Sequence, residues 1–394
     1  MSELIPDVGY VSLNKFGEQL CGDHVEIVDG EDGSLVVVLA DGLGSGVKAS
    51  ILSTLTAKII STMMANGLSL ADCVDTIAAT LPVCSERQVA YSTFSILQVF
   101  NNGDAYLAEF DNPGCIFIRD GKLFPIPKNE RTIKDKTINE FRFKVQTGDT
   151  LVLMSDGTTH AGVGRLWHFG WEWEDIARFV EKQCEQPVSS IRLASAVCGE
   201  CDELYQYRPG DDTTVAVMRI IERKTVHLMT GPPVDRDDDR KMVEDFMAGE
   251  GVKRIVSGGT TATILSRILG RQLQVSIDYY DPDIPPIAHM EGVELVTEGV
   301  LTLNRAVSIL TRYVENKDLS RGFFEELDKN NGASMIARML LEDCTDLHLF
   351  VGKAVNGAYQ SSGLLFELGI RQNLVKQLID IAEKMGKSVT VTYY

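Results

Sequence analysis

Two apolar, β-branched segments in the first half of the chain end in the same dipeptide. Residues 35–40 and 150–155 are almost continuously apolar, which predicts buried strands. Asp-Gly follows each segment directly, at Asp41-Gly42 and at Asp156-Gly157. After the first segment, apolar residues recur with helical spacing from Val47 to about residue 65, where Asn66-Gly67 ends the pattern. The pattern therefore predicts a strand, a glycine-rich turn and a helix, with an acidic residue where the strand ends.

The rest of the first half is predicted to consist of helices and short strands. A second helix is expected over 71–81, ended by Pro82, and two more over 174–183 and 187–200. Strand-like segments separated by turn signals such as Asn-Asn-Gly and Asn-Pro-Gly indicate an antiparallel meander, and a final strand is expected over 215–221. We therefore expect an α+β fold with helices packed outside the sheets.

From Thr225 onward the pattern changes to alternating strands and helices. Helices are predicted over 237–250, 261–269, 302–315 and 371–384, with two shorter ones between 323 and 341. Apolar segments between these helices are typical of the strands of a mostly parallel sheet. The charged residues 222–224 separate the two patterns, so we expect two domains, 1–221 and 225–394, the second of the α/β class.

Composition narrows the possible partners. The 394 residues include 38 Lys and Arg against 56 Asp and Glu, a net charge of −18; the part up to Ile221, with 18 basic and 31 acidic residues, carries −13 of it. This balance argues against binding to nucleic acid or to an anionic membrane. With no secretory signal pattern and no apolar run of about 18 residues, we expect a cytoplasmic protein. The 8 cysteines are sparse and irregularly spaced, which favours reduced thiols.

Four acidic residues occupy similar positions at predicted strand ends. Asp41 and Asp156 follow the two apolar segments, Asp211 precedes the strand at 215–221, and Asp23 opens a short strand. Carboxylates at strand ends, beside glycines that allow close backbone approach, suit hard divalent cations, which prefer oxygen ligands. Two such ions about 3.5 to 4 Å apart can position a water-derived nucleophile for attack on phosphorus. The four positions together therefore predict a metal centre.

These motifs resemble a known family. Asp23 in Gly-Asp, the segments LADGLGSGVKAS and LVLMSDGTTHAG, and GDDTTVAVMRI are similar to the sporulation stage II protein E-like (SpoIIE-like) phosphatases. These form a bacterial branch of the metal-dependent protein phosphatase 2C-like (PP2C-like, PPM) superfamily. The resemblance covers about residues 5–221. It implies a four-layer α-β-β-α sandwich for the first domain.

The resemblance also implies a role for each acidic position. Asp41 would bridge two Mn²⁺ or Mg²⁺ ions, and Gly42 would offer its backbone carbonyl. Asp156 and Asp211 would each bind one of the metals. Asp23 would support the centre, through water, and Asp212 occupies the position that is Asn or Asp in relatives. The implied catalytic residues are Asp41, Asp156 and Asp211.

The implied activity is hydrolysis of phosphoserine and phosphothreonine in proteins by a metal-bridging hydroxide, in one step, within bacterial signalling. Phosphorylated regulators of the anti-sigma-factor antagonist type are the archetypal substrates of the family. The residue that protonates the leaving group is not identified; His160 is one candidate, and a surface or packing role is the alternative. Unlike eukaryotic relatives, which place a phosphate-binding Arg near the N-terminus, this chain has only Lys15 before Asp23.

Two other functions stay open. The first is a metal-binding pseudophosphatase that acts as a ligand sensor. The second is a small-molecule phosphatase whose C-terminal domain supplies the substrate site. The region 160–176, which holds all 3 Trp residues, is either a substrate-recognition or switching element or ordinary helix packing. Cys198 and Cys201 have the spacing of half a zinc knuckle, but without a second pair we expect two packed thiols.

In the second half, a strand at 254–257 leads into a Gly-Gly turn and a hydroxyl-rich helix start. The backbone N–H groups there favour an anionic small ligand on Gly258, Gly259, Thr260 and Thr261. The alternative is a tight turn with a Thr helix cap. Residues 278–287 are expected to form an exposed loop. A regulatory or ligand-binding role and a homodimer both stay open for this domain.

Overall fold

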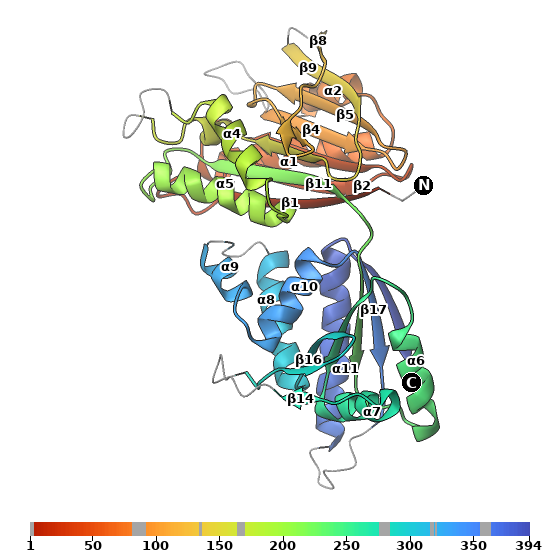
Figure 1. The fold of residues 1–394 in the computed structure, drawn as a ribbon. Helices are drawn as coiled ribbons and strands as arrows, with labels where there is room; N and C mark the ends of the chain where they lie inside the picture. The colour runs from red at the N-terminus through yellow and green to blue at the C-terminus, as the bar shows by residue number, and fades with distance from the viewer. Residues whose placement is uncertain are drawn as a thin grey trace. The chain divides into compact units, whose positions relative to one another are not determined.

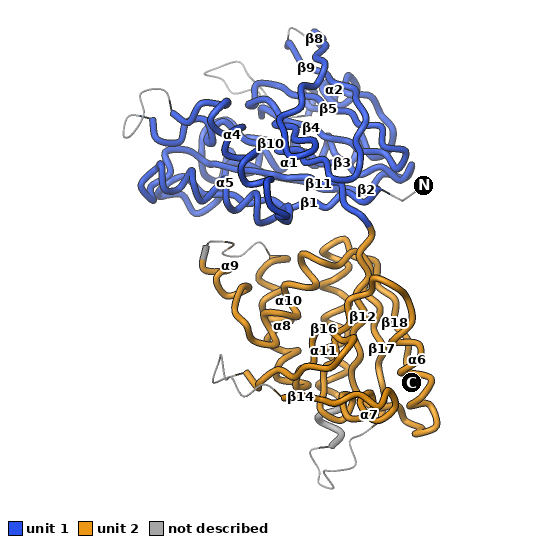
Figure 2. The backbone as a smooth tube through the Cα atoms, viewed as in Figure 1, with its two compact units in different colours: residues 1–222 blue, residues 223–394 orange. Residues whose placement is uncertain are grey.

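The computed structural model describes residues 4–80, 92–133, 136–163, 170–275, 284–315, 319, 321–354 and 364–394. The chain forms two compact units, Met1–Glu222 (unit 1) and Arg223–Tyr394 (unit 2) (Figure 2). Among the helices of the described residues, none combines the length and the apolar composition that a bilayer crossing requires.

Unit 1 contains two antiparallel sheets (Figure 1). The first sheet, in spatial order, consists of β1 (Ile5–Leu13), β11 (Thr213–Ile221), β10 (Thr150–Met154), β6 (Ile116–Arg119) and β7 (Lys122–Leu123). The second consists of β2 (Asp23–Asp29), β3 (Leu35–Asp41), β4 (Thr93–Val99), β5 (Asp104–Phe110), β9 (Lys136–Lys144) and β8 (Lys128–Ile133). Val37, Leu39 and Leu107 of the second sheet share one buried cluster with Leu151 and Met218 of the first. The two sheets therefore pack face to face around this core.

Helices cover the outer faces of the two sheets. Unit 1 has α1 (Gly46–Ala65), α2 (Leu70–Thr80), α3 (Asp156–Thr159), α4 (Trp173–Gln183) and α5 (Ser190–Leu204). Ile60 of α1 and Ile77 of α2 pack with Val36, Val38 and Ile96 of the second sheet, and α5 packs against β1 and β11. The predicted α-β-β-α sandwich is thereby confirmed. Strand β3 is buried on both faces, because Val36 and Val38 pack with α1 whereas Val37 and Leu39 pack with the first sheet.

Several predicted boundaries differ from the structure. Helix α5 begins at Ser190 rather than at Pro187, because Ser189 acts as the N-cap and its hydroxyl accepts a hydrogen bond from the Arg192 N–H at 3.4 Å. The Asp156-Gly157 dipeptide starts the short helix α3. The predicted end of the second helix, at Leu81, lies outside the described residues.

Unit 2 has one seven-stranded sheet that is mostly parallel, as predicted. Its spatial order is β14 (Gln274–Val275), β15 (Ala288–Met290), β16 (Val293–Thr297), β13 (Lys253–Ser257), β12 (Thr225–Thr230), β17 (Asp346–Val351) and β18 (Ser388–Tyr393). Among the described strands of this sheet, β15 runs antiparallel to both of its neighbours, β14 and β16. The five parallel strands, numbered along the chain, follow the order 3-2-1-4-5, which is the order of doubly wound α/β domains.

Helices connect the parallel strands of unit 2, since parallel neighbours need a crossover connection. They are the 3₁₀ helix η1 (Arg236–Asp238), α6 (Asp239–Met247), α7 (Gly259–Leu269), α8 (Val300–Val314), α9 (Arg321–Leu327), α10 (Gly332–Glu342) and α11 (Leu364–Lys384). Phe246 of α6 and Leu265 of α7 pack on one sheet face with Met229, Val256 and Phe350. Helix α8 packs against α10 and α11 (Figure 1). Helix α11 begins seven residues before the predicted start at 371.

Candidate metal centre

Asp23 and Asp41 come together because their strands pair. Asp23 is the first residue of β2 and Asp41 the last of β3, and the antiparallel register places them directly opposite each other. Asp23 is buried, whereas Asp41 is partly exposed. The carboxyl groups of these two residues therefore meet at one end of the second sheet.

Asp156, Asp211 and Asp212 approach the same place from the first sheet. Asp156 lies one residue beyond Ser155, at the end of β10, and Asp211 and Asp212 precede β11. These ends are adjacent because β10 and β11 are antiparallel neighbours, and the Ser155 N–H donates to the Thr214 carbonyl at 3.0 Å. The structure thus brings together all five acidic residues that the sequence predicts, from both sheets of the sandwich.

Ser155, which no sequence motif singles out, connects the two groups of carboxylates. Its hydroxyl donates to Asp23 Oδ2 at 2.7 Å and accepts from the Thr214 N–H at 2.9 Å. The Ser155 side chain is completely buried. A hydroxyl has one proton to donate, so this pair of bonds fixes the direction of the Ser155 O–H toward Asp23. Only the pairing of β10 with β11 reveals this role.

The acidic cluster is electrostatically strained without a cation. Burial, followed by the charges of Asp23, Asp156 and Asp211, holds the pKa of Asp41 well above its usual range. Burial likewise raises the pKa of Asp23. Lys15 supplies a partial counter-charge: its Nζ lies 3.6 Å from Asp211 Oδ1, and its backbone N–H donates to Asp212 Oδ1 at 3.0 Å. Because the surroundings disfavour the ionised form of these carboxylates, a divalent cation would stabilise the site.

Unpartnered oxygens provide a separate test of whether a metal fits. In the described part of the chain, four buried side-chain oxygens have no hydrogen-bond partner, and three of them lie in or beside the cluster: Asp23 Oδ1, Thr158 Oγ1 and Asp212 Oδ2. Burying such oxygens without a partner costs free energy of about 1 to 3 kcal/mol each. Carboxylate oxygens that face no protein donor are the ligands that Mg²⁺ and Mn²⁺ prefer, so the residues present fit these ions.

Two glycines allow the backbone to pack closely around the cluster. A Cβ atom on Gly42 would lie 2.1 Å from the Ala49 carbonyl oxygen of α1, and one on Gly157 would lie 2.0 Å from the Asp212 carbonyl oxygen. The Gly42 N–H donates to the Gly22 carbonyl at 3.1 Å, which ties the loop after β3 to the segment before Asp23. Glycine is therefore needed at positions 42 and 157 because a side chain would clash with neighbouring backbone, and not because of a positive φ.

On the exposed side of the cluster, a second group of ligand atoms converges. One atom each from Asp156, His160 and Asp211 lies within 4.8 Å of the others. His160 Nδ1 is 3.8 Å from Asp156 Oδ1, one helical turn away. From the sequence alone, His160 is expected to be an acid or a surface or packing residue.

Other predicted features lie away from the cluster. Trp171 is buried against Phe179, and Trp173 Nε1 donates to the Gly114 carbonyl at 2.7 Å, so both pack structurally. Trp167 lies outside the described residues. Cys198 and Cys201 are free, buried thiols of α5, and burial raises the pKa of both.

In unit 2, helix α7 begins at Gly259, and its N-cap is Gly258 with φ 127° rather than a threonine. No side-chain hydrogen bond caps this helix. Thr260 and Thr261 fall in its first turn. The predicted anion site therefore has an N-terminus that is open to a backbone-bound ligand, and it stays a prediction. Of the predicted loop 278–287, residues 278–283 lie outside the described residues.

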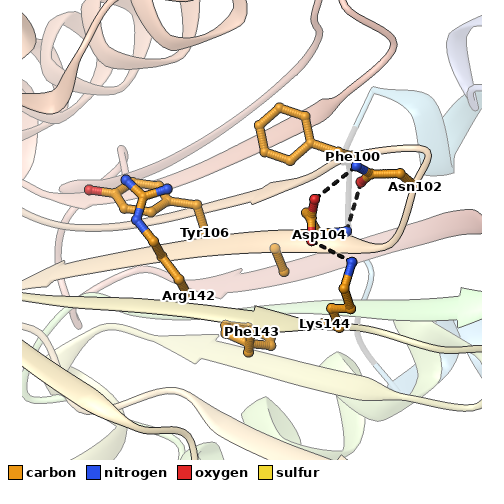
Figure 3. Close-up of a pocket in the computed structure, with 8 residues that line it drawn as sticks. Phe100, Asn102, Asp104, Tyr106, Arg142, Phe143 and Lys144 are labelled. Carbon is orange, nitrogen blue, oxygen red and sulfur yellow. Dashed lines mark hydrogen bonds and ion pairs between the residues drawn. The ribbon is translucent and has the colours of Figure 1, made fainter.

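A cavity of about 600 Å³ in unit 1 lies apart from the acidic cluster (Figure 3). It is lined from the β4–β5 turn and from β9, and Lys144 Nζ pairs with Asp104 Oδ1 there at 2.7 Å, while Arg142 stacks on Tyr106. Strand β4 begins beside Asp41 and ends near this cavity, so the two places are separated by the strand length, roughly 20 Å. The cavity is therefore separate from the acidic cluster.

Comparison with known proteins gives the family of unit 1. Residues 31–221 match the family model of the stage II sporulation protein E (SpoIIE). No curated protein matches the sequence. Among solved structures, a PP2C phosphatase domain with a regulatory-domain fragment of the cell fate determinant SpoIIE from Bacillus subtilis is 18% identical with a TM-score of 0.47, and the match covers 57% of this chain and 64% of that chain.

Two further solved structures are similar to this chain. The phosphatase domain of SpoIIE from Bacillus subtilis, in a crystal form without domain swapping, is 19% identical with a TM-score of 0.43, covering 56% of this chain and 95% of that chain. The RsbU and RsbW domains of a Mycobacterium tuberculosis protein are 13% identical with a TM-score of 0.46, covering 62% and 69%. The SpoIIE family model thus matches residues 31–221, which lie within unit 1.

Proposed function

We propose that unit 1 is a protein serine/threonine phosphatase that depends on two Mn²⁺ or Mg²⁺ ions and acts in bacterial signalling. The observation that carries the proposal is the convergence of Asp23, Asp41, Asp156, Asp211 and Asp212 from both sheets, beside buried oxygens that have no protein partner. The SpoIIE match supports the same reaction class.

In this proposal each residue has a definite task. The charges of Asp23, Asp156 and Asp211 all act on Asp41. Asp41 would therefore contact both ions, together with the Gly42 carbonyl. Asp156 and Asp211 would bind on the exposed side, and Asp23 and Asp212 on the buried side. Bound divalent ions would supply positive charge for the phosphoryl oxygens and would activate water. Ser155 would hold Asp23 in place throughout.

The substrate would be a phosphoserine or phosphothreonine protein of the anti-sigma-factor antagonist type, which is the family's archetype. Unit 2 would have a regulatory or ligand-binding function, with an anionic small ligand at Gly258, Gly259, Thr260 and Thr261. Its doubly wound strand order supports a ligand at this edge, since ligands of such sheets bind at the carboxyl ends of the strands.

The test uses the purified full chain, stripped of metal and assayed on phosphopeptides and p-nitrophenyl phosphate. We expect hydrolysis of phosphopeptides only with Mn²⁺ or Mg²⁺, and a loss of roughly a hundredfold or more in Asp41→Asn and Asp156→Asn, because each removes a ligand charge. Asp120→Asn is the matched control. It makes the same chemical change in an exposed turn with φ 51°, a conformation that Asn tolerates.

Other results would select the alternative functions. Activity that survives both substitutions would rule out the metal assignment. Hydrolysis of p-nitrophenyl phosphate without any phosphopeptide hydrolysis would favour a small-molecule phosphatase. Bound Mn²⁺ that raises the melting temperature, with no phosphoester hydrolysed, would favour a sensor.

A further inference from the structure

His160 lies where a metal ligand would be expected on the exposed side of the cluster. Helix α3 starts at Asp156, and His160 follows it by four residues, so the two side chains lie on one face of the helical turn. Asp211 reaches the same point from the segment before β11. Ligand atoms bound at right angles to one ion about 2.1 Å away lie about 3 Å apart, so atoms within 4.8 Å need only small side-chain movements to share an ion.

The backbone that presents His160 is held firmly. The His160 N–H donates to the Asp156 carbonyl at 3.0 Å, and the Tyr205 hydroxyl donates to the Gly157 carbonyl at 2.7 Å. The Gly157 Cα lies so close to the Asp212 carbonyl that a Cβ there would be 2.0 Å from its oxygen, so α3 and the segment 211–212 are in direct contact. The packing of unit 1 therefore sets the distance between the backbone at His160 and the backbone at Asp211.

The side chains themselves remain accessible to solvent. Those of His160, Asp156 and Asp211 are 54%, 44% and 38% exposed. An ion held by three such groups keeps open positions for water or substrate, as catalytic metal sites do. The buried Asp23 and Asp212 oxygens, by contrast, offer only oxygen ligands. The cluster thus has an all-oxygen side and a side that includes nitrogen.

We propose that the His160 imidazole is a ligand of the exposed metal ion, together with Asp156 and Asp211, and that it makes this site selective for Mn²⁺ over Mg²⁺. An imidazole nitrogen suits transition metals, whereas Mg²⁺ prefers oxygen ligands and retains water. The inference rests on the proposed function, because it assigns a ligand within the proposed metal centre. It replaces the role of leaving-group acid for His160.

The test measures metal binding directly on the metal-free full chain. Titration calorimetry gives Mn²⁺ and Mg²⁺ affinities for the native protein, His160→Gln and His160→Asp, with His289→Gln, an exposed histidine of β15, as the control. We expect His160→Gln to weaken Mn²⁺ binding at one site by about tenfold or more and to leave Mg²⁺ binding nearly unchanged. His160→Asp should bind Mg²⁺ more tightly than the native protein, which lowers the Mn²⁺ preference.

Pulsed electron paramagnetic resonance on the Mn²⁺-loaded protein supplies a second readout that is independent of activity. Coupling of Mn²⁺ to an imidazole nitrogen should be present in the native protein and in His289→Gln, and absent in His160→Gln. Mn²⁺ binding that depends on Asp41 but shows no nitrogen coupling would overturn the role of His160 and leave the metal centre intact. A protein that binds no Mn²⁺ would overturn both proposals. Unchanged Mn²⁺ affinity in His160→Gln, with slower turnover of phosphopeptides only, would instead identify His160 as the acid.

Discussion

Asp23 and Asp41 face each other as direct partners in the antiparallel β2–β3 pair, where two like charges repel. Neither residue has an Arg or Lys partner in the described structure, and the pKa of each is raised. A pair of this kind reduces the stability of the metal-free protein. Such local cost is typical of functional sites, where the fold maintains an arrangement that is favourable only when the ligand is bound.

Ser155→Ala should weaken both the fold and metal binding. The substitution removes the donor to Asp23 Oδ2 and the acceptor of the Thr214 N–H, both of which are buried. We expect a loss of about 2 kcal/mol in the free energy of unfolding of the metal-free protein. Urea unfolding followed by Trp fluorescence reports on unit 1, because all 3 Trp residues lie there. Ser155→Thr, which keeps the hydroxyl, should retain part of the Mn²⁺ affinity that Ser155→Ala loses. Native Mn²⁺ affinity in Ser155→Ala would contradict the role of Ser155 in connecting the two groups of carboxylates.

Lys15→Met should tighten Mn²⁺ binding, because the Lys15 ammonium group competes with the ion for Asp211. The pair is about one-third exposed, with side-chain exposures of 37% and 38%. The gain is therefore modest, about two- to fivefold in the dissociation constant at low salt, and smaller in 0.5 M salt. Calorimetric titration at both salt concentrations checks this. Weaker Mn²⁺ binding in Lys15→Met would show that Lys15 supports the centre rather than competing with it.

Gly157→Ala and Gly199→Ala form a matched pair on two helices of unit 1. A Cβ on Gly157 would lie 2.0 Å from the Asp212 carbonyl oxygen, whereas one on Gly199 meets nothing within 4 Å. We expect Gly157→Ala to separate α3 from β11, with a loss of Mn²⁺ affinity and a lower melting temperature. Gly199→Ala should raise stability by about 0.5 to 1 kcal/mol, since Ala is the better helix former. Equal melting temperatures for the two variants would contradict the close approach.

Glu109 should make unit 1 less stable as pH rises. Its side chain is 3% exposed, and burial raises the pKa to about 7, although the Cys115 N–H donates to Oε1 at 2.6 Å. Below pH 4.5, near the pKa of Glu in the unfolded chain, the Glu109 carboxyl is neutral in both the folded and the unfolded state. Its ionisation then does not change the free energy of unfolding. Between about pH 4.5 and 7 the unfolded state ionises first, so stability falls by up to about 3 kcal/mol and then stays level.

Glu109→Gln keeps an acceptor for the Cys115 N–H and removes the ionisation. We expect its stability advantage over the native protein to be larger at pH 8 than at pH 5. Urea unfolding with EDTA present, at both pH values, checks this, because the difference between the two proteins cancels the contribution of the acidic cluster. A larger advantage at pH 5 would contradict the raised pKa.

The strand-end pattern predicted where the acidic residues lie along the chain, because Asp41 and Asp156 follow strands whose apolar continuity is visible in the sequence. It did not predict Ser155, Thr158 or the position of His160 beside Asp211. Those relationships depend on which strands of two sheets become neighbours, and single-strand patterns do not contain that information. For the same reason, the partner of Trp173, the Gly114 carbonyl, could not be foreseen. The start of α5 differs from the prediction because the Ser189 cap, rather than Pro187, marks where the helix begins.

The pairing of β1 with β11 sets the order in which unit 1 can form during synthesis. Ile5 pairs with Ile221 and Leu13 with Thr213, so the first strand of the unit finds its neighbour only after the last strand has been made. Asp211 and Asp212 immediately precede that last strand. A nascent chain that ends before β11 therefore lacks both a complete first sheet and two of the five carboxylates. Metal ions would be captured late, and an emerging chain would hold an unpaired β1 until the ribosome has passed residue 221.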